Sequence, residues 1–190
     1  MIIGITGGTG CGKTTFLDLI REKGGIVLDC DAIYHQLLKT DKALLGAIEK
    51  RFPGTVVDGA LQRKKLGSIV FNDKAALEDL NKITHSAVKA EVVRLLTPEP
   101  TLAAIDAIGL FESGLDKLCK PTVAIDAPRE VRIARLMNRD SISAEYAAAR
   151  IDAQPTGAEF ARRCDYTLVN DGTREEFQEK CLAFFHQVGL

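Results

Sequence analysis

The sequence lacks three features that would each point to a particular class of protein. It has 25 basic and 26 acidic side chains and a formal net charge of −1, so bulk charge does not favour a nucleic-acid scaffold. No apolar run approaches the roughly 20 residues that a membrane-spanning helix needs. The short apolar start also lacks the basic segment of a signal peptide. These absences predict an ordinary soluble globular protein with neither a membrane nor a nucleic-acid partner.

The cysteines are few, odd in number and widely scattered, with no Cys-x-x-Cys pair: Cys11, Cys30, Cys119, Cys164 and Cys181. This pattern does not favour a zinc site or a disulfide framework. We therefore expect a reducing, cytoplasmic setting.

What the sequence does contain is a glycine-rich segment at residues 7–14, Gly-Gly-Thr-Gly-Cys-Gly-Lys-Thr. It matches the phosphate-binding loop pattern Gly-x-x-x-x-Gly-Lys-Ser/Thr, with Gly7, Gly12, Lys13 and Thr14 at the fixed positions. Residues 1–6 before it read as a buried strand, and residues 14–23 after it read as a helix. The alternative, a glycine-rich turn that binds nothing, fits this complete strand–loop–helix context poorly.

Each residue type in the loop has a physical reason to be there. Glycines allow successive backbone N–H groups to turn inward, and the helix that follows adds its positive end. Lys13 can reach the β- and γ-phosphates of ATP, and the Thr14 hydroxyl can bind Mg²⁺. The full set of expected ATP contacts in the loop is Gly8, Thr9, Gly10, Cys11, Gly12, Lys13, Thr14 and Thr15. The helix terminus could lower the pKa of Cys11, but a small residue filling a serine or alanine position is the favoured interpretation.

Strand and helix patterns alternate along the rest of the chain. Further strands are expected at 26–28, 101–105, 122–125 and 166–169, and helices at 32–51 (with a break around 39–42), 74–96, 129–137, 143–153 and 174–188. Together with the loop, this predicts an α/β, three-layer P-loop NTPase fold with about five parallel strands. We expect one domain with a core at about 1–40, 99–135 and 164–190, a helical acceptor-binding insert at about 41–98, and a lid at about 136–163.

Asp29 and Asp31 follow the second strand, where the ligand crevice of an open α/β sheet lies. If both were on the strand, their carboxylates would face the same way. Either could cap the following helix. Asp31 is the favoured candidate for a base or metal-binding role.

The remaining motifs narrow the class of P-loop protein. The Asp-x-x-Gly switch and the Asn-Lys-x-Asp guanine reader of a GTPase are missing. Arginines at 132, 135, 139 and 150 instead suggest the lid of a small-molecule kinase, where arginines close over the transferred phosphoryl group. Arg139 is the favoured phosphate contact, whereas Arg132 and Arg150 are expected to lie on a solvated basic face.

Taken together, these residues resemble the dephospho-coenzyme A kinase family. The matching segments follow one another in the right order over most of the chain: 4–14, 29–31, 58–66, 70–71, 110–112, 137–140 and 165–172, with His85, Arg135 and Gln154. The resemblance implies an ATP- and Mg²⁺-dependent transferase that phosphorylates the ribose 3′-hydroxyl of dephospho-CoA, the last step of coenzyme A biosynthesis.

The resemblance also implies roles for single residues. Asp31 would be the base, with Lys13 and Arg139 as the other catalytic residues, and Asn170 would contact ATP. The acceptor would be bound by Asp31, Arg63, His85, Leu110, Phe111 and Glu112. Alternatives remain for some of them, since His85, Leu110 and Phe111 could be core residues and Glu112 could cap a helix.

The chain departs from the family pattern at Ser86, where the family usually has proline, and at Phe160, where a basic residue is common. It also has Ile108-Gly109 where the family has Pro-Leu before Leu-Phe-Glu, so the rigid proline at the start of that loop is missing. These positions concern the acceptor side and the lid. Two rival functions therefore stay open: a nucleoside or nucleotide kinase of the same fold, and a nucleotide-binding regulator without turnover.

Overall fold

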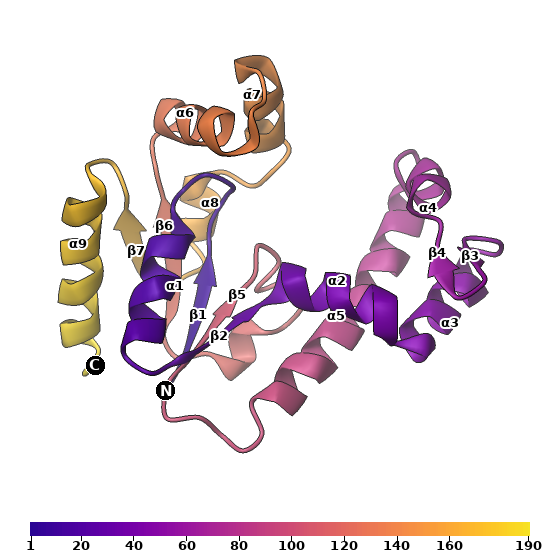
Figure 1. Cartoon of the computed structure of the whole chain (residues 1–190), viewed down its shortest axis with the longest axis horizontal. Helices are drawn as coiled ribbons and strands as arrows, with labels where there is room; N and C mark the ends of the chain where they lie inside the picture. The colour runs from indigo at the N-terminus through magenta and orange to yellow at the C-terminus, as the bar shows by residue number, and fades with distance from the viewer. The chain divides into compact units, whose positions relative to one another are not determined.

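The computed structural model describes all 190 residues, and their contacts divide the chain into two compact units (Figure 1). The first, which we call the sheet unit, comprises residues 1–28, 100–111 and 115–190. The second, the helical unit, comprises residues 29–99 and 112–114. The predicted division into core, insert and lid stays a prediction.

The sheet unit is built on five parallel strands, as the sequence predicts. They are β1 (Ile2–Thr6), β2 (Ile26–Asp29), β5 (Ala103–Asp106), β6 (Thr122–Asp126) and β7 (Tyr166–Val169), in the order β2-β5-β1-β6-β7. In the register of the central pair, Ile3 lies beside Ala104. β5 begins two residues later than predicted, at Ala103, and the Thr101 carbonyl before it accepts a hydrogen bond from the amino terminus at 2.7 Å.

The sheet unit also contains five α-helices. They are α1 (Lys13–Glu22), α6 (Arg129–Asp140), α7 (Ala144–Asp152), α8 (Gly157–Ala161) and α9 (Arg174–Gln187), with a 3₁₀ turn, η1, at Asp116–Leu118. The core lies where α1 and α9 pack together: the ring of Phe16 is 4.8 Å from that of Phe185, and Ile3 and Ile5 are fully buried beside them. This core fixes the end of β1 and the start of α1, and therefore the loop between them.

The helical unit consists of α2 (Cys30–Thr40), α3 (Lys42–Arg51), α4 (Arg63–Val70) and α5 (Lys74–Leu95), with the hairpin β3 (Val56–Val57) and β4 (Ala60–Leu61). The long helix α5 packs against α2, α3 and α4 and organises the unit (Figure 1). The turn signal at 58–59 is confirmed as the turn of the hairpin.

One local prediction is confirmed and another is corrected. The predicted break around 39–42 in the helical stretch 32–51 is confirmed, because Asp41 Oδ1 accepts hydrogen bonds from the N–H groups of Ala43 and Leu44 and starts a new helix. The interpretation of Asp31 as part of the second strand is wrong, because the strand ends at Asp29 and Asp31 lies in the first turn of α2.

None of the helices combines the length and apolar character that crossing a membrane requires.

Candidate active site

The glycine-rich segment forms the connection between β1 and α1 in the sheet unit. Gly12 is the N-cap of α1 with φ 94°, a left-handed conformation that favours glycine. Lys13 begins the helix, and its ammonium group donates to the Gly7 carbonyl at 2.9 Å and lies 3.9 Å from Asp106 Oδ1. The lysine is thereby folded back over the loop, with its charge at the carboxyl ends of β1 and β5.

Three side chains from later in the chain hold the carbonyl oxygens of the loop. Arg132 Nε donates to Thr9 O at 2.9 Å, and Asn170 Nδ2 donates to Cys11 O at 2.9 Å. Arg135 Nη1 lies 3.4 Å from the carbonyl oxygens of Gly10 and Cys11, while its Nη2 donates to Asn170 Oδ1 at 3.0 Å. Asn170, predicted as an ATP contact, therefore lies directly against the loop.

A fourth side chain reaches an N–H group of the same loop. The Thr9 N–H donates to Gln154 Oε1 at 2.7 Å. Gln154 lies between α7 and α8, within the segment predicted as the lid. The loop is thus held from α6, from the α7–α8 connection and from the end of β7.

The arginines predicted for the lid are not equivalent. The expectation that Arg132 lies on a solvated face is wrong: its side chain turns toward the loop, and the residue is 5% exposed. Arg139 and Arg150 both donate to the carboxylate of Asp140, at 2.7 Å and 2.6 Å. These hydrogen bonds lower the pKa of Asp140 to about 2. Arg139, the favoured phosphate contact, is exposed at the end of α6 and paired with Asp140.

The oxygen atoms available at the loop suit a Mg²⁺ ion that is bound by the protein and a nucleotide together. They do not suit a metal ion bound by protein side chains alone. No group of three or more His, Cys, Asp or Glu side chains is placed to hold a metal ion. Thr14 is exposed in the first turn of α1, and Asp106 offers a carboxylate beside Lys13. One or two protein oxygens plus phosphate oxygens are the usual surroundings of Mg²⁺ in such sites.

Cys11 is packed into the core beneath the loop, at 1% exposure. Burial raises the pKa of its thiol, and the nearby charges of Lys13 and Arg132 offset only part of this. The side chain therefore fills a small buried space, in agreement with the favoured interpretation, and only its backbone can face a ligand.

In the helical unit, the start of α2 separates the roles of the two aspartates. Asp29 is the N-cap, because its Oδ1 accepts hydrogen bonds from the N–H groups of Asp31 and Ala32 at 2.9 Å and 3.0 Å. Asp31 is exposed in the first turn. The cap is thus assigned to Asp29, and the Asp31 carboxylate is not used for capping.

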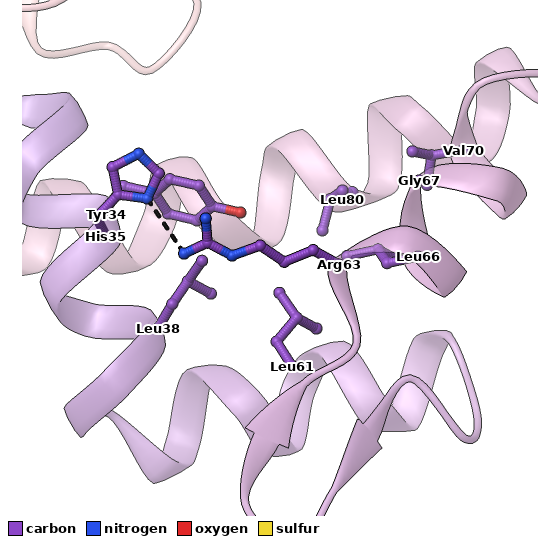
Figure 2. A pocket seen from close by; sticks show the side chains of 9 residues that line it. All are labelled: Tyr34, His35, Leu38, Leu61, Arg63, Leu66, Gly67, Val70 and Leu80. Atoms are coloured by element: carbon purple, nitrogen blue, oxygen red, sulfur yellow. Dashed lines mark hydrogen bonds between the residues drawn. The ribbon is translucent and has the colours of Figure 1, made fainter.

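A cavity of about 220 Å³ lies in the same unit (Figure 2). Its walls are mostly apolar: Leu38, Leu61, Leu66, Gly67, Val70 and Leu80. Arg63 extends across it, with Nη2 3.5 Å from His35 Nδ1, and the Tyr34 ring lies beside the guanidinium (Figure 2). Burial raises the pKa of Tyr34, partly offset by the charge of Arg63, so the phenol is neutral at pH 7.

Tyr34 and His35 were not singled out from the sequence, although their spacing was a signal. Asp31, Tyr34, His35 and Leu38 follow one another at positions i, i+3, i+4 and i+7 of α2, which places them on one helix face. The carboxylate of Asp31 therefore lies one turn from the cavity.

The remaining predicted acceptor residues do not line this cavity. His85 is half-buried in α5, and Glu112 is exposed in the short segment 112–114 of the helical unit. In the sheet unit, Leu110 is fully buried, as a core residue would be. Phe111 packs under Arg163, whose guanidinium carbon is 4.4 Å from the ring centroid. The structure thus groups Arg63 with Tyr34 and His35 rather than with His85.

Known proteins match this chain over most of its length. A family model described as Dephospho-CoA kinase matches residues 1–176. The chain belongs to the dephospho-CoA kinase family. A dephospho-CoA kinase from Lactobacillus johnsonii is 34% identical over 193 residues, which cover 98% of both chains.

Solved structures agree with this assignment. A protein from Thermus thermophilus has a TM-score of 0.82 at 32% identity, over 100% of this chain and 98% of that one. The dephospho-CoA kinase from Campylobacter jejuni has a TM-score of 0.68 at 27% identity, over 98% and 96%.

Among the departures from the family pattern, Phe160 has a clear structural setting. It is 5% exposed on α8. An apolar side chain is therefore suited to this position, where a charged one would be buried. Ser86 is exposed on α5 and Gly109 follows β5; neither lines the cavity of the helical unit.

Proposed function

We propose that this chain transfers the γ-phosphoryl group of ATP to the 3′-hydroxyl of dephospho-CoA, in the last step of coenzyme A biosynthesis. The match of the family model over residues 1–176 carries this proposal. The phosphate loop supports the donor half, and the cavity at Arg63 supports the acceptor half.

On the donor side, the loop N–H groups and Lys13 bind the phosphates of ATP. Thr14 would hold Mg²⁺, with Asp106 as a second candidate ligand, and the ion would neutralise charge that develops on the phosphate oxygens. Phosphoryl transfer has a loose transition state, so positioning and charge stabilisation supply most of the catalysis. Arg139 would add charge from the lid once it exchanges Asp140 for phosphate.

On the acceptor side, Asp31 takes the proton of the attacking hydroxyl. Its carboxylate is exposed and is not used for capping, and it shares a helix face with Tyr34 and His35. Arg63 then binds an anionic part of the acceptor, because a guanidinium can hold a phosphate through two hydrogen bonds. The apolar walls around it suit an uncharged part of the same molecule.

A panel of acceptors tests the proposal. With ATP and Mg²⁺, ADP release should occur with dephospho-CoA and be at background with nucleosides and nucleoside monophosphates. Turnover of a nucleoside instead would favour the rival kinase. Tight ATP binding without ADP release on any acceptor would favour the nucleotide-binding regulator.

Replacing each of the two aspartates in turn with asparagine tests which of them is the general base. Asp31→Asn should keep ATP binding and lower turnover by roughly 10²–10⁴, the usual contribution of a general base. Asp29→Asn is the matched control, since asparagine is also a good N-cap and turnover should stay close to that of the parent. Loss of turnover in the Asp29 variant alone would transfer the role of base to Asp29.

A further inference from the structure

We infer that Arg132 is a positioning residue of the phosphate loop, and that it sets the direction of the Gly10 N–H group toward a nucleotide phosphate. The inference rests on the proposed function only in taking a nucleoside polyphosphate as the ligand of the loop. Arg132 comes from α6, 123 positions from its acceptor in the sequence, and its Nε donates to Thr9 O at 2.9 Å.

The geometry of the peptide group connects this hydrogen bond to the ligand. The Thr9 carbonyl and the Gly10 N–H belong to the same planar, trans peptide, and therefore point in opposite directions. When Arg132 holds the carbonyl on its own side, the N–H must face the other side. Inward-facing N–H groups are what makes a glycine-rich loop an anion site.

A second contact fixes the neighbouring peptide. The Thr9 N–H, which belongs to the Gly8–Thr9 peptide, donates to Gln154 Oε1 at 2.7 Å. The peptides on both sides of Thr9 are thus held by side chains. A flip of the Thr9–Gly10 peptide would break the hydrogen bond from a charged donor.

Because the Arg132 side chain is buried, it cannot turn away from the loop to bind another group. The residue is 5% exposed, and its buried Nη2 has no hydrogen-bond partner. A side chain on Gly8 would collide with the guanidinium, and a Cβ on Gly10 would come within 3.0 Å of the Arg132 carbonyl oxygen. Since an unpartnered buried N–H is unfavourable, stability alone does not account for an arginine here. The hydrogen bond with good geometry that Arg132 makes is the one to the Thr9 carbonyl of the loop.

The experiment compares a ligand that carries phosphate with one that does not. ADP and adenosine are titrated by NMR into the parent chain and into Arg132→Met, which fills similar space without the donor. The variant should bind ADP about tenfold more weakly, the loss of roughly one charge-assisted hydrogen bond, with adenosine affinity changed by less than about twofold. The shift of the Gly10 amide proton on addition of ADP should also shrink.

Arg129→Met is the matched control, because Arg129 lies one turn away on α6 and pairs with Asp152 at 2.8 Å. It should leave ADP affinity and the Gly10 shift unchanged. Arg132→Lys should restore part of both, since an ammonium group can also donate to the Thr9 carbonyl. If Arg132→Met does not fold, Arg132→Lys is compared with the parent chain in its place, and it should show a smaller loss that is again confined to ADP.

Equal losses for ADP and adenosine would overturn the inference, because they would mean a purely structural role. Unchanged ADP affinity and an unchanged Gly10 shift would also overturn it. The Gly10 shift reports on the phosphate loop and the titrations involve no phosphoryl transfer, so a failure of the proposed acceptor chemistry leaves this measurement unaffected.

Discussion

At the scale of single residues, the two halves of the proposed chemistry depend on arginines in very different surroundings. Arg132 is buried against the phosphate loop, and Arg63 extends across an apolar cavity near Tyr34 and His35. The first acts on the backbone of the protein itself. The second has a guanidinium available to an incoming anion, because its hydrogen bond to His35 is long, at 3.5 Å.

Arg63→Gln is expected to raise the KM for dephospho-CoA by about tenfold or more, the loss of a charge-assisted contact. The KM for ATP should stay close to that of the parent, because the phosphate loop belongs to the sheet unit. Steady-state kinetics with each substrate varied in turn provide the measurement. The control is Lys64→Gln, the neighbouring exposed residue, which does not line the cavity. A rise in the KM for ATP alone would contradict the assignment of Arg63 to the acceptor.

At the scale of elements, Asp140 links the end of α6 to α7. Its carboxylate accepts hydrogen bonds from Arg139 on its own helix and from Arg150 on the next. Beneath them, Leu136, Ala147 and Ile151 form a small core between the two helices. The hydrogen bonds to Asp140 therefore lie above an apolar contact between α6 and α7, in the segment predicted as the lid.

A pH titration tests this link. The pKa of Asp140 is lowered to about 2 by hydrogen bonds from both arginines. A carboxyl group with a depressed pKa stabilises the folded state above its unfolded pKa, and loses this contribution as the pH falls through the folded value. The α6–α7 link should thus persist at pH 4 and weaken toward pH 2.

Carboxyl-carbon NMR of Asp140 gives the midpoint directly. In Arg150→Gln the midpoint should move up toward the ordinary aspartate value, while Arg21→Gln on α1 should leave it unchanged. An ordinary midpoint in the parent chain would show that the pair of arginines does not hold this carboxylate.

The helices and strands also show how much of the fold could be predicted from the sequence. The loop motif and five apolar strands were readable because each is a local pattern. The directions of the arginine side chains on α6 could not be predicted in this way. Spacings of three and four place Arg132, Arg135 and Arg139 on a common side of the helix. Only packing decides that Arg132 is buried while Arg139 stays exposed. Similarly, Arg63 meets Tyr34 and His35 only when α4 and α2 are assembled around α5.

Short elements were missed for a related reason. The helix α8 has 5 residues and α4 has 8, too few for a clear apolar period. For α8 a signal was present, since Thr156 and Glu159 form a capping box.

At the scale of the whole molecule, the residues of the two proposed sites lie in two compact units. The sheet unit contains the phosphate loop with Lys13, and the helical unit contains Asp31 and the cavity at Arg63. Family membership connects them in one reaction, since a kinase for dephospho-CoA needs both a nucleotide site and an acceptor site.

Product analysis tests this central claim most directly. The chain is incubated with ATP, Mg²⁺ and dephospho-CoA, and the products are quantified by chromatography and phosphorus NMR. We predict one coenzyme A, phosphorylated on the ribose 3′-hydroxyl, for each ADP formed. ADP without a matching amount of coenzyme A, or a phosphate at another position, would contradict it.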